Sequence, residues 1–216
     1  MWPFYLTILI FLGVLILPFL VVFLLINFFA IGLANLGLSS SAGLLIVLAI
    51  FFGSFVNLPL TKKKTVKVRD RRLFGILERE IVTNQGLSIN LGGAIIPVFI
   101  ASILIPNAPF YATVISVLAT TLVAYKSAKI IPGIGITMTA AFPVLVAFLL
   151  ALLLAPESPE IVAFISGVLG TLIGADLLHL PQFLKNPDRM SISIGGAGVF
   201  DGIFLTGIVA SLLAGI

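Results

Sequence analysis

Long apolar runs, separated by short polar stretches, dominate the hydrophobic pattern of this chain. Most of them approach 20 residues and are apolar on every face, which is typical of helices that cross a membrane. The pattern predicts about seven such helices. We place them at Trp2–Ala30, Ala42–Leu60, Asn90–Ile105, Pro109–Tyr125, Ile134–Ala155, Pro159–Leu180 and from Ile194 to the C-terminus. We therefore expect an all-α polytopic membrane protein, with residues 1–216 forming a single transmembrane domain.

The one substantial polar segment covers residues 61–86 and is rich in lysine and arginine. Alternating apolar residues at Thr65–Val68 and Ile76–Val82 would suit a small hairpin or sheet. We prefer a solvated basic loop on the cytoplasmic side, attracted to anionic lipid headgroups. A nucleic-acid surface is not expected, because Phe74 is the only aromatic residue there that could stack on a base.

Composition agrees with a membrane protein. Hydrophobic residues make up 60% of the 216 residues and charged residues only 9%, whereas soluble domains have about 25% charged residues. Mean hydropathy is +1.28. Cysteine is absent, which excludes disulfides and thiolate metal sites.

The basic residues predict an orientation in the membrane. All 12 lysines and arginines fall in the loops after the second, fourth and sixth predicted helices. The opposite loops carry none, and one of them contains Glu157 and Glu160. By the positive-inside rule, the basic loops and the N-terminus are cytoplasmic and the C-terminus lies outside the cell membrane.

Asp176, His179 and Asp201 are the only ionisable side chains that we place inside the membrane. An ionised group at the centre of a span costs about 2.5–3.5 kcal/mol on insertion scales, so these residues are the candidate site. Both aspartates should lie about 7–10 Å below the cytoplasmic helix ends, at similar depth on neighbouring helices. Two carboxylates that close share a proton, so one can act as base and the other as acid.

Glycines surround the two predicted catalytic aspartates. They would let a backbone or a substrate approach the carboxylates closely, and they weaken the start of the last helix. Together with His179, which we expect mainly as a hydrogen-bond partner, they form the predicted supporting or substrate-binding set: Gly174, Gly195, Gly196, Gly198 and Gly202.

A short pattern occurs twice along the chain. Ser88–Ala94 resembles Ser191–Ala197, and the Leu-Pro sequence after Asn57 recurs after His179. We interpret this as a duplicated hairpin, in which the second and third helices correspond in parallel orientation to the sixth and seventh. Ordinary packing of small residues between helices is the alternative. The first copy lacks both acids, but it can contribute Asn57 and Asn90 to the site.

These motifs carry two resemblances. Asn-Leu-Pro, Asn-Leu-Gly-Gly-Ala, Pro-Gly-Ile-Gly-Ile, Gly-Ala-Asp-Leu and Gly-Gly-Ala-Gly-Val-Phe-Asp-Gly-Ile-Phe together resemble an uncharacterised prokaryotic, largely archaeal, membrane family. The last two predicted helices resemble the catalytic pair of presenilin-type intramembrane aspartyl proteases, and the segment from Asp201 to Ile208 is similar to the stretch after their second aspartate. The sequence departs from those proteases at Ala175, where they have tyrosine. It also departs directly before Asp201, where they have Gly-x-Gly and this chain has Gly-Val-Phe.

Several functions are compatible with these residues. Our preferred hypothesis is an intramembrane aspartyl hydrolase, in which Asp176 and Asp201 activate water and a transmembrane peptide is the substrate. The alternative is a transporter or channel that uses the same acids to bind a proton, a cation or a small polar solute. A metal site of Asp176, His179 and Asp201 and a purely structural acid–imidazole pair are weaker alternatives. We expect no cofactor, the lipid bilayer as the surroundings and no nucleic-acid partner, and we leave a homo-oligomer open.

Overall fold

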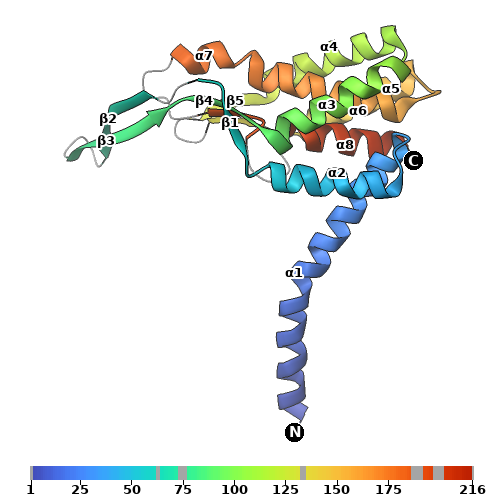
Figure 1. Ribbon diagram of the computed structural model, residues 1–216, viewed down its shortest axis with the longest axis horizontal. Helices are drawn as coiled ribbons and strands as arrows, with labels where there is room; N and C mark the ends of the chain where they lie inside the picture. Colours follow the sequence, from blue (N-terminus) through green and yellow to red (C-terminus); the bar gives the residue numbers. More distant parts are fainter. Residues whose placement is uncertain are drawn as a thin grey trace.

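A computed structural model describes residues 2–61, 64–72, 77–131, 135–185, 192–196 and 202–215. The protein is mostly helical, and most of its helices lie side by side in one bundle (Figure 1). The strands and α7 gather at one end of this bundle, and the C-terminus lies at the other end (Figure 1).

The main helices are α1 (Trp2–Asn35), α2 (Ser40–Gly53), α3 (Ile96–Leu104), α4 (Phe110–Ser127), α5 (Ala141–Leu154), α6 (Pro159–Thr171), α7 (Leu180–Lys185) and α8 (Gly202–Ala214). Three short segments extend them: the π-helical η1 (Leu91–Ile95) and η3 (Leu172–Leu177) and the 3₁₀ segment η2 (Ile105–Asn107). Within the described residues, three helices are long and apolar enough to cross a membrane: Phe11–Asn35, Phe110–Ser127 and Pro159–Gln182. Four shorter apolar helices accompany them, so each predicted helix has a counterpart.

The expectation of a purely helical protein was too narrow, because the described residues also form small sheets. β1 (Asn57–Pro59), β4 (Leu87–Asn90) and β7 (Ile192–Ile194) form one sheet in the order β1-β4-β7. β5 (Ala128–Ile131) and β6 (Gly135–Met138) form an antiparallel pair beside it.

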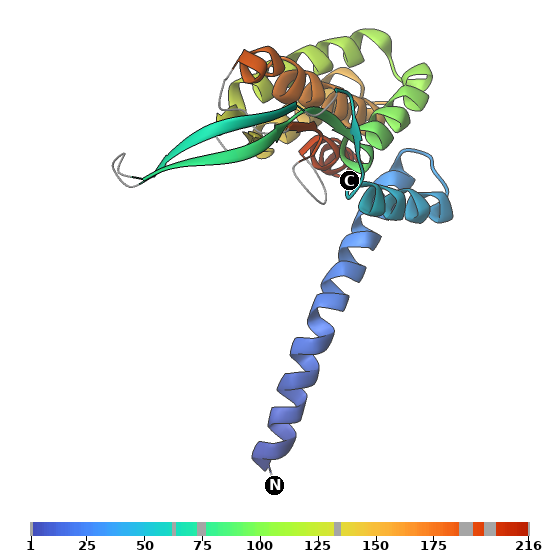
Figure 2. The same cartoon turned by 60° about the vertical axis from the view of Figure 1, so that its left-hand side comes forward.

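The polar segment is a hairpin and not the basic loop that we preferred. β2 (Lys64–Arg72) pairs antiparallel with β3 (Leu77–Gln85), in a register that joins Lys64 to Gln85 and Arg72 to Leu77. The ribbon extends well beyond the bundle (Figure 2). The alternation in the sequence therefore predicted its local structure better than its high charge did.

The other differences from the sequence prediction lie at helix ends near the sheets. The second helix ends at Gly53 instead of Leu60, because Pro59 disfavours helical backbone before it and Asn57–Pro59 pair with β4. The fifth helix begins at Ala141 instead of Ile134, because Gly135–Met138 belong to β6. The last helix begins at Gly202 instead of Ile194, because Ile192–Ile194 form β7.

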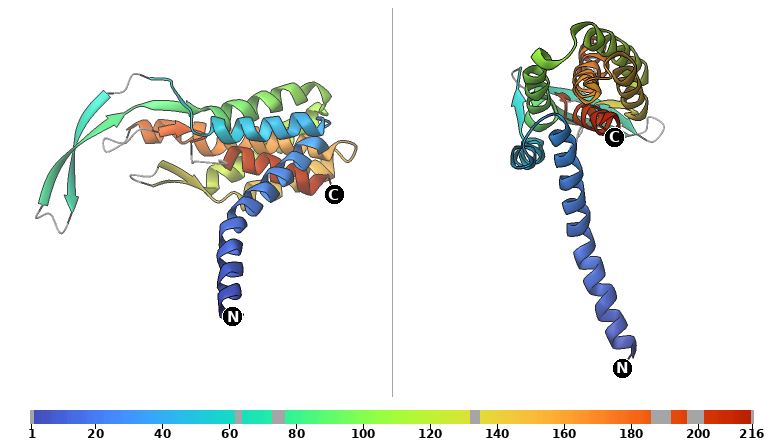
Figure 3. Two further views of the ribbon diagram at one scale, coloured as in Figure 1. Left: turned by 60° about the horizontal axis from the view of Figure 1, so that its bottom comes forward. Right: turned by 90° about the vertical axis from the view of Figure 1, so that its right-hand side faces the viewer.

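Helix α1 has two parts with different surroundings. Its last turns lie against the bundle, whereas its N-terminal part projects away from it (Figures 1 and 3). Large apolar side chains are exposed along that part, including Phe11, Phe19 and Phe23. The N-terminus therefore does not lie at the strand end of the bundle. Seven helices that alternate in direction along the bundle would have placed it there.

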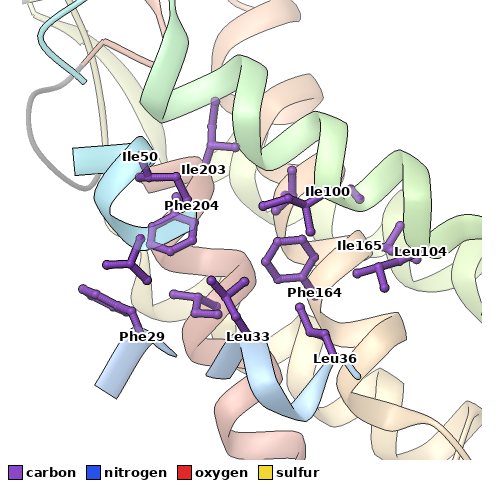
Figure 4. Close-up of a cluster of buried hydrophobic side chains, with 14 of the residues drawn as sticks. Phe29, Leu33, Leu36, Ile50, Ile100, Leu104, Phe164, Ile165, Ile203 and Phe204 are labelled. Carbon is purple, nitrogen blue, oxygen red and sulfur yellow. The ribbon is translucent and has the colours of Figure 1, made fainter. Parts of the chain in front are cut away.

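The largest core cluster joins five helices. Side chains from the end of α1 and the turn after it meet side chains of α2, α3, α6 and α8 (Figure 4). The first group is Phe29, Leu33 and Leu36, and the second is Ile50, Ile100, Leu104, Phe164, Ile165, Ile203 and Phe204. The rings of Phe29 and Phe204 pack edge to face, with centroids 5.4 Å apart. This cluster holds the end of α1 in the bundle while the rest of that helix departs from it.

Small residues allow α4, α6 and α8 to pack closely. A methyl group built on Gly167 of α6 would lie 2.6 Å from the Cα of Gly207 in α8. One built on Gly170 would lie 2.6 Å from the Cβ of Thr120 in α4. Such contacts are typical of helices that associate inside membranes, where short side chains let backbones approach. They fix α6, which carries Asp176 at its end, in the centre of the bundle.

Candidate functional site

Asp176 lies where α6 passes into its π-helical end, η3. Single π-helical turns inserted in α-helices are rare and occur frequently at functional sites. Neighbouring Gly174 packs against α4, because a methyl group there would collide with the carbonyl oxygen of Thr121. The Asp176 side chain is half-buried. Its carboxylate thus lies at the strand end of the bundle, with partial access to solvent.

The Asp176 carboxylate contacts the glycine-rich segment that leads to α8. The backbone N–H of Gly195 donates a hydrogen bond to Asp176 Oδ2 over 2.8 Å. Gly195 has a φ of +64°, which favours glycine. A side chain there would also collide with Gly93 and Ala94 of η1. Glycine is therefore required at position 195 for both the backbone conformation and the close packing against η1.

A network of polar side chains joins the three strands beside this contact. Asn90 is fully buried and caps η1, its Oδ1 accepting a hydrogen bond from the N–H of Gly93 over 2.7 Å. Its Nδ2 donates to the carbonyl of Ser54 and to Oδ1 of Asn57. The hydroxyl of Ser193 donates to the same Asn57 oxygen. Asn57 therefore links β4 to β7, two residues before Gly195.

The two similar sequence motifs meet at this sheet. β4 and β7 are parallel neighbours, and Ser88 pairs with Ser193, whereas the motif alignment would match Ser88 with Ser191. Leu91–Ile95 are π-helical, but Gly195 lies in a turn. The contact between the motifs is direct, and their origin by duplication stays a prediction.

His179 has a structural environment. It is buried, and its Nδ1 lies 3.1 Å from the carbonyl oxygen of Gly174. A carbonyl only accepts, so Nδ1 carries the hydrogen in this contact. The imidazole also packs on the ring of Tyr125, with centroids 4.6 Å apart. These contacts attach the end of η3 to α4.

We expect His179→Phe to lower the free energy of unfolding by about 1–3 kcal/mol, because the buried Gly174 carbonyl loses its side-chain donor. Phenylalanine retains the packing on Tyr125, so the fold should persist. Thermal unfolding of the purified variant in detergent measures this effect. A catalytic role for the imidazole would instead appear as a loss of turnover of about 10²-fold or more with unchanged stability.

Asp201 and Gly198 lie outside the described residues, so their predicted position beside Asp176 is untested. Gly196 and Gly202, on either side of this segment, are described. Gly196 is exposed beyond β7, and Gly202 begins α8 with the Met138 methyl group of β6 about 3.5 Å from a β-carbon built on it. Among the described residues, which do not include Asp201, no three His, Asp or Glu side chains gather closely enough to hold a metal ion.

Sequence reasoning missed Ser193, Ser54 and Tyr125. The only available signal for Ser193 was its position two residues before Gly195 in the repeated motif. Pairing of β1, β4 and β7 could not be inferred from the sequence, because these strands are only three or four residues long.

The chain matches one known family over the whole of this site. The DUF1614 family, described as proteins of unknown function, matches residues 51–213. The chain belongs to this family. The match begins in α2 and ends in α8, so it includes the three-stranded sheet and both aspartates and leaves α1 outside. No curated protein and no solved structure matches the chain.

Proposed function

We propose that this protein is an integral membrane hydrolase in which Asp176 and Asp201 activate water to cleave a membrane-embedded peptide. The observation that carries the proposal is the hydrogen bond from the Gly195 N–H to the Asp176 carboxylate. It attaches the first acid to the segment that contains the second acid six residues later. The resemblance of the last two predicted helices to presenilin-type proteases supports the same pairing.

The distribution of charge supports a transmembrane orientation for the bundle. The β2–β3 hairpin, β5 and α7, which contain most of the basic residues, lie at one end, opposite the C-terminus (Figure 1). We propose that this end is cytoplasmic and that the C-terminus lies outside. The cytoplasmic N-terminus expected from the sequence would further require the projecting part of α1 to lie along the bundle within the bilayer. The projecting part of α1 is apolar on its exposed faces and would be covered by lipid.

The proposed chemistry divides two proton transfers between the acids. The ionised carboxylate takes a proton from a water molecule while the oxygen of that water attacks the peptide carbonyl carbon. At the same time, the protonated carboxyl donates its proton to the carbonyl oxygen. As the C–N bond breaks, the carboxyl that took its proton from water gives it to the leaving nitrogen. The other carboxylate regains its proton from a hydroxyl of the tetrahedral intermediate as the carbonyl re-forms. A like-charged neighbour keeps one of the two carboxyls protonated, which is the state that this mechanism requires.

The sheet offers a place for an extended substrate. β7 is at an edge in the order of the described strands, and it leads directly into Gly195 and Gly196. Extended peptides add to sheet edges through main-chain hydrogen bonds. Because Gly195 packs against η1, the substrate backbone would lie along β7 and beside the exposed Gly196.

The deciding experiment uses purified protein in liposomes with a panel of single-span peptides, followed for peptide cleavage and for internal pH in parallel. The proposal predicts cleavage. The competing function is transport of a proton, cation or polar solute by the same acids. Proton flux without cleavage, lost on replacing either aspartate, would establish that alternative and overturn the proposal.

A further inference from the structure

Six hydroxyl groups inside the bundle are buried without a hydrogen-bond partner among the described residues. We call them the interior hydroxyls: Ser116, Thr120 and Thr121 of α4, Thr171 of α6, and Thr206 and Ser211 of α8. Ser166 of α6 is buried as well, yet its hydroxyl donates to the carbonyl of Ala163. Burial in a helix therefore does not by itself account for the missing partners.

The interior hydroxyls lie on three helices that meet at α6. Thr120 packs against Gly170, which precedes Thr171, and the backbone at Thr121 packs against Gly174, two residues before Asp176. Further along the same face of α6, the backbone at Thr206 contacts Gly167. The glycine face of α6 thus brings hydroxyls from α4 and α8 to the helix that carries Asp176.

The hydroxyls extend from the depth of Asp176 into the middle of the bundle. At a rise of about 1.5 Å per residue, Thr206 lies about 6 Å and Ser211 about 13 Å from the start of α8 at the strand end. Thr120 and Ser116 lie about 10 and 16 Å from the end of α4 on the same side. The row therefore continues inward from the site and does not merely surround it.

The chemistry of these groups selects a small neutral ligand. Each hydroxyl can donate one hydrogen bond and accept others, and none carries charge. Buried polar groups that lack protein partners are commonly satisfied by internal water, which needs two to four polar neighbours. A divalent metal ion would favour several carboxylate ligands, and the described lining offers only Asp176, at one end of the row.

We propose that the interior hydroxyls bind water and form a hydrated path that leads from the middle of the bundle to Asp176. Hydration of this path is independent of the proposed hydrolase activity. Its use, to supply water and exchange protons with the aspartate pair, rests on that activity. The path would supply water to the side of the half-buried Asp176 carboxylate that faces the helices.

The absence of cysteine from the chain makes a direct test available. Single cysteines replace Thr120, Thr171 and Thr206, and their modification by methyl methanethiosulfonate is followed by mass spectrometry in liposomes. Matched controls are Ala101→Cys and Ala147→Cys, at fully buried positions within apolar clusters. Only the thiolate reacts, and it forms where water solvates it, so hydrated positions should react about tenfold faster or more than the controls.

Equal rates at the threonine and alanine positions would overturn the water path. Where a cysteine variant does not fold, the melting temperature of the Thr→Val variant at the same position tests whether water binds there. Loss of a hydroxyl bonded to water lowers the melting temperature, whereas loss of a dry, unpaired hydroxyl raises it and refutes the proposal. If the introduced cysteines do not react but the protein still cleaves peptides, the water path is refuted and the hydrolase is not. If the cysteines react but the protein does not cleave peptides, the hydrolase is refuted and the water path is not.

Discussion

Asp176→Asn and Asp201→Asn are each expected to lower peptide cleavage by about 10²–10⁴-fold, because neither acid alone can take and give the two protons of the reaction. Asparagine has the shape of aspartate, and its side-chain oxygen still accepts a hydrogen bond from the Gly195 N–H. The fold should therefore persist, which circular dichroism and gel filtration of the purified variants would verify. Initial rates of cleavage in liposomes measure the effect.

The two substitutions should not add. When two residues act as a unit, replacing one of them already removes the contribution of both to the rate. Cleavage by the double variant should therefore be no slower than cleavage by either single variant. Glu157→Gln is the matched control, since this carboxylate lies between α5 and α6 at the opposite end of the bundle. Independent, multiplying losses would show that the aspartates contribute separately and do not form a pair.

Gly195→Ala should destabilise the protein strongly and move the segment that leads to α8 away from Asp176. A β-carbon at φ +64° costs about 1–2 kcal/mol, and it would lie 2.8 Å from backbone atoms of Gly93 and Ala94, which cannot easily move. Overpacking of this kind adds about 1–3 kcal/mol. We expect a total loss of about 2–5 kcal/mol, measured as a lower melting temperature, together with loss of cleavage.

Gly37→Ala separates the two causes. Gly37 has a similar φ of +82°, but nothing lies within 4 Å of a β-carbon built there. This variant should show only the backbone cost and retain cleavage. If both variants were equally stable, the contact between Gly195 and η1 would not be the constraint that the structure indicates.

The sequence predicted the positions of the apolar helices well, because each forms a long run that only a helix can satisfy in an apolar environment. It predicted their ends less well. Asn57–Pro59 and Ile192–Ile194 are apolar enough to resemble helix, yet they pair with β4, and a pairing between distant segments leaves no local signal. The sequence also did not predict that α1 leaves the bundle. A helix that is apolar on every face carries no signal for which neighbour it contacts.

The candidate site was predicted in part. The rarity of ionisable residues in apolar runs identified Asp176, and the glycines around it were identified by the same motif. The role of Gly195 needed a φ value and a contact with Ala94 that only the three-dimensional structure supplies. Asn90 and Asn57 were selected as site residues, whereas the structure shows them connecting strands and capping η1. His179 was expected mainly as a hydrogen-bond partner; it contacts the Gly174 carbonyl, and its part in the site stays a prediction.

Proximity of Asp176 and Asp201 is the central claim, and cross-linking in this cysteine-free chain tests it most directly. The double variant Asp176→Cys/Asp201→Cys is treated with methanediyl bismethanethiosulfonate, which joins only sulfur atoms a few ångströms apart. Asn57→Cys/Ser193→Cys is the positive control, because these side chains are hydrogen-bonded. Intact mass spectrometry distinguishes one bridging linker with no free thiol from two separate additions. A paired site predicts a single bridge in both variants; two separate additions at positions 176 and 201, with a bridge in the control, would contradict it.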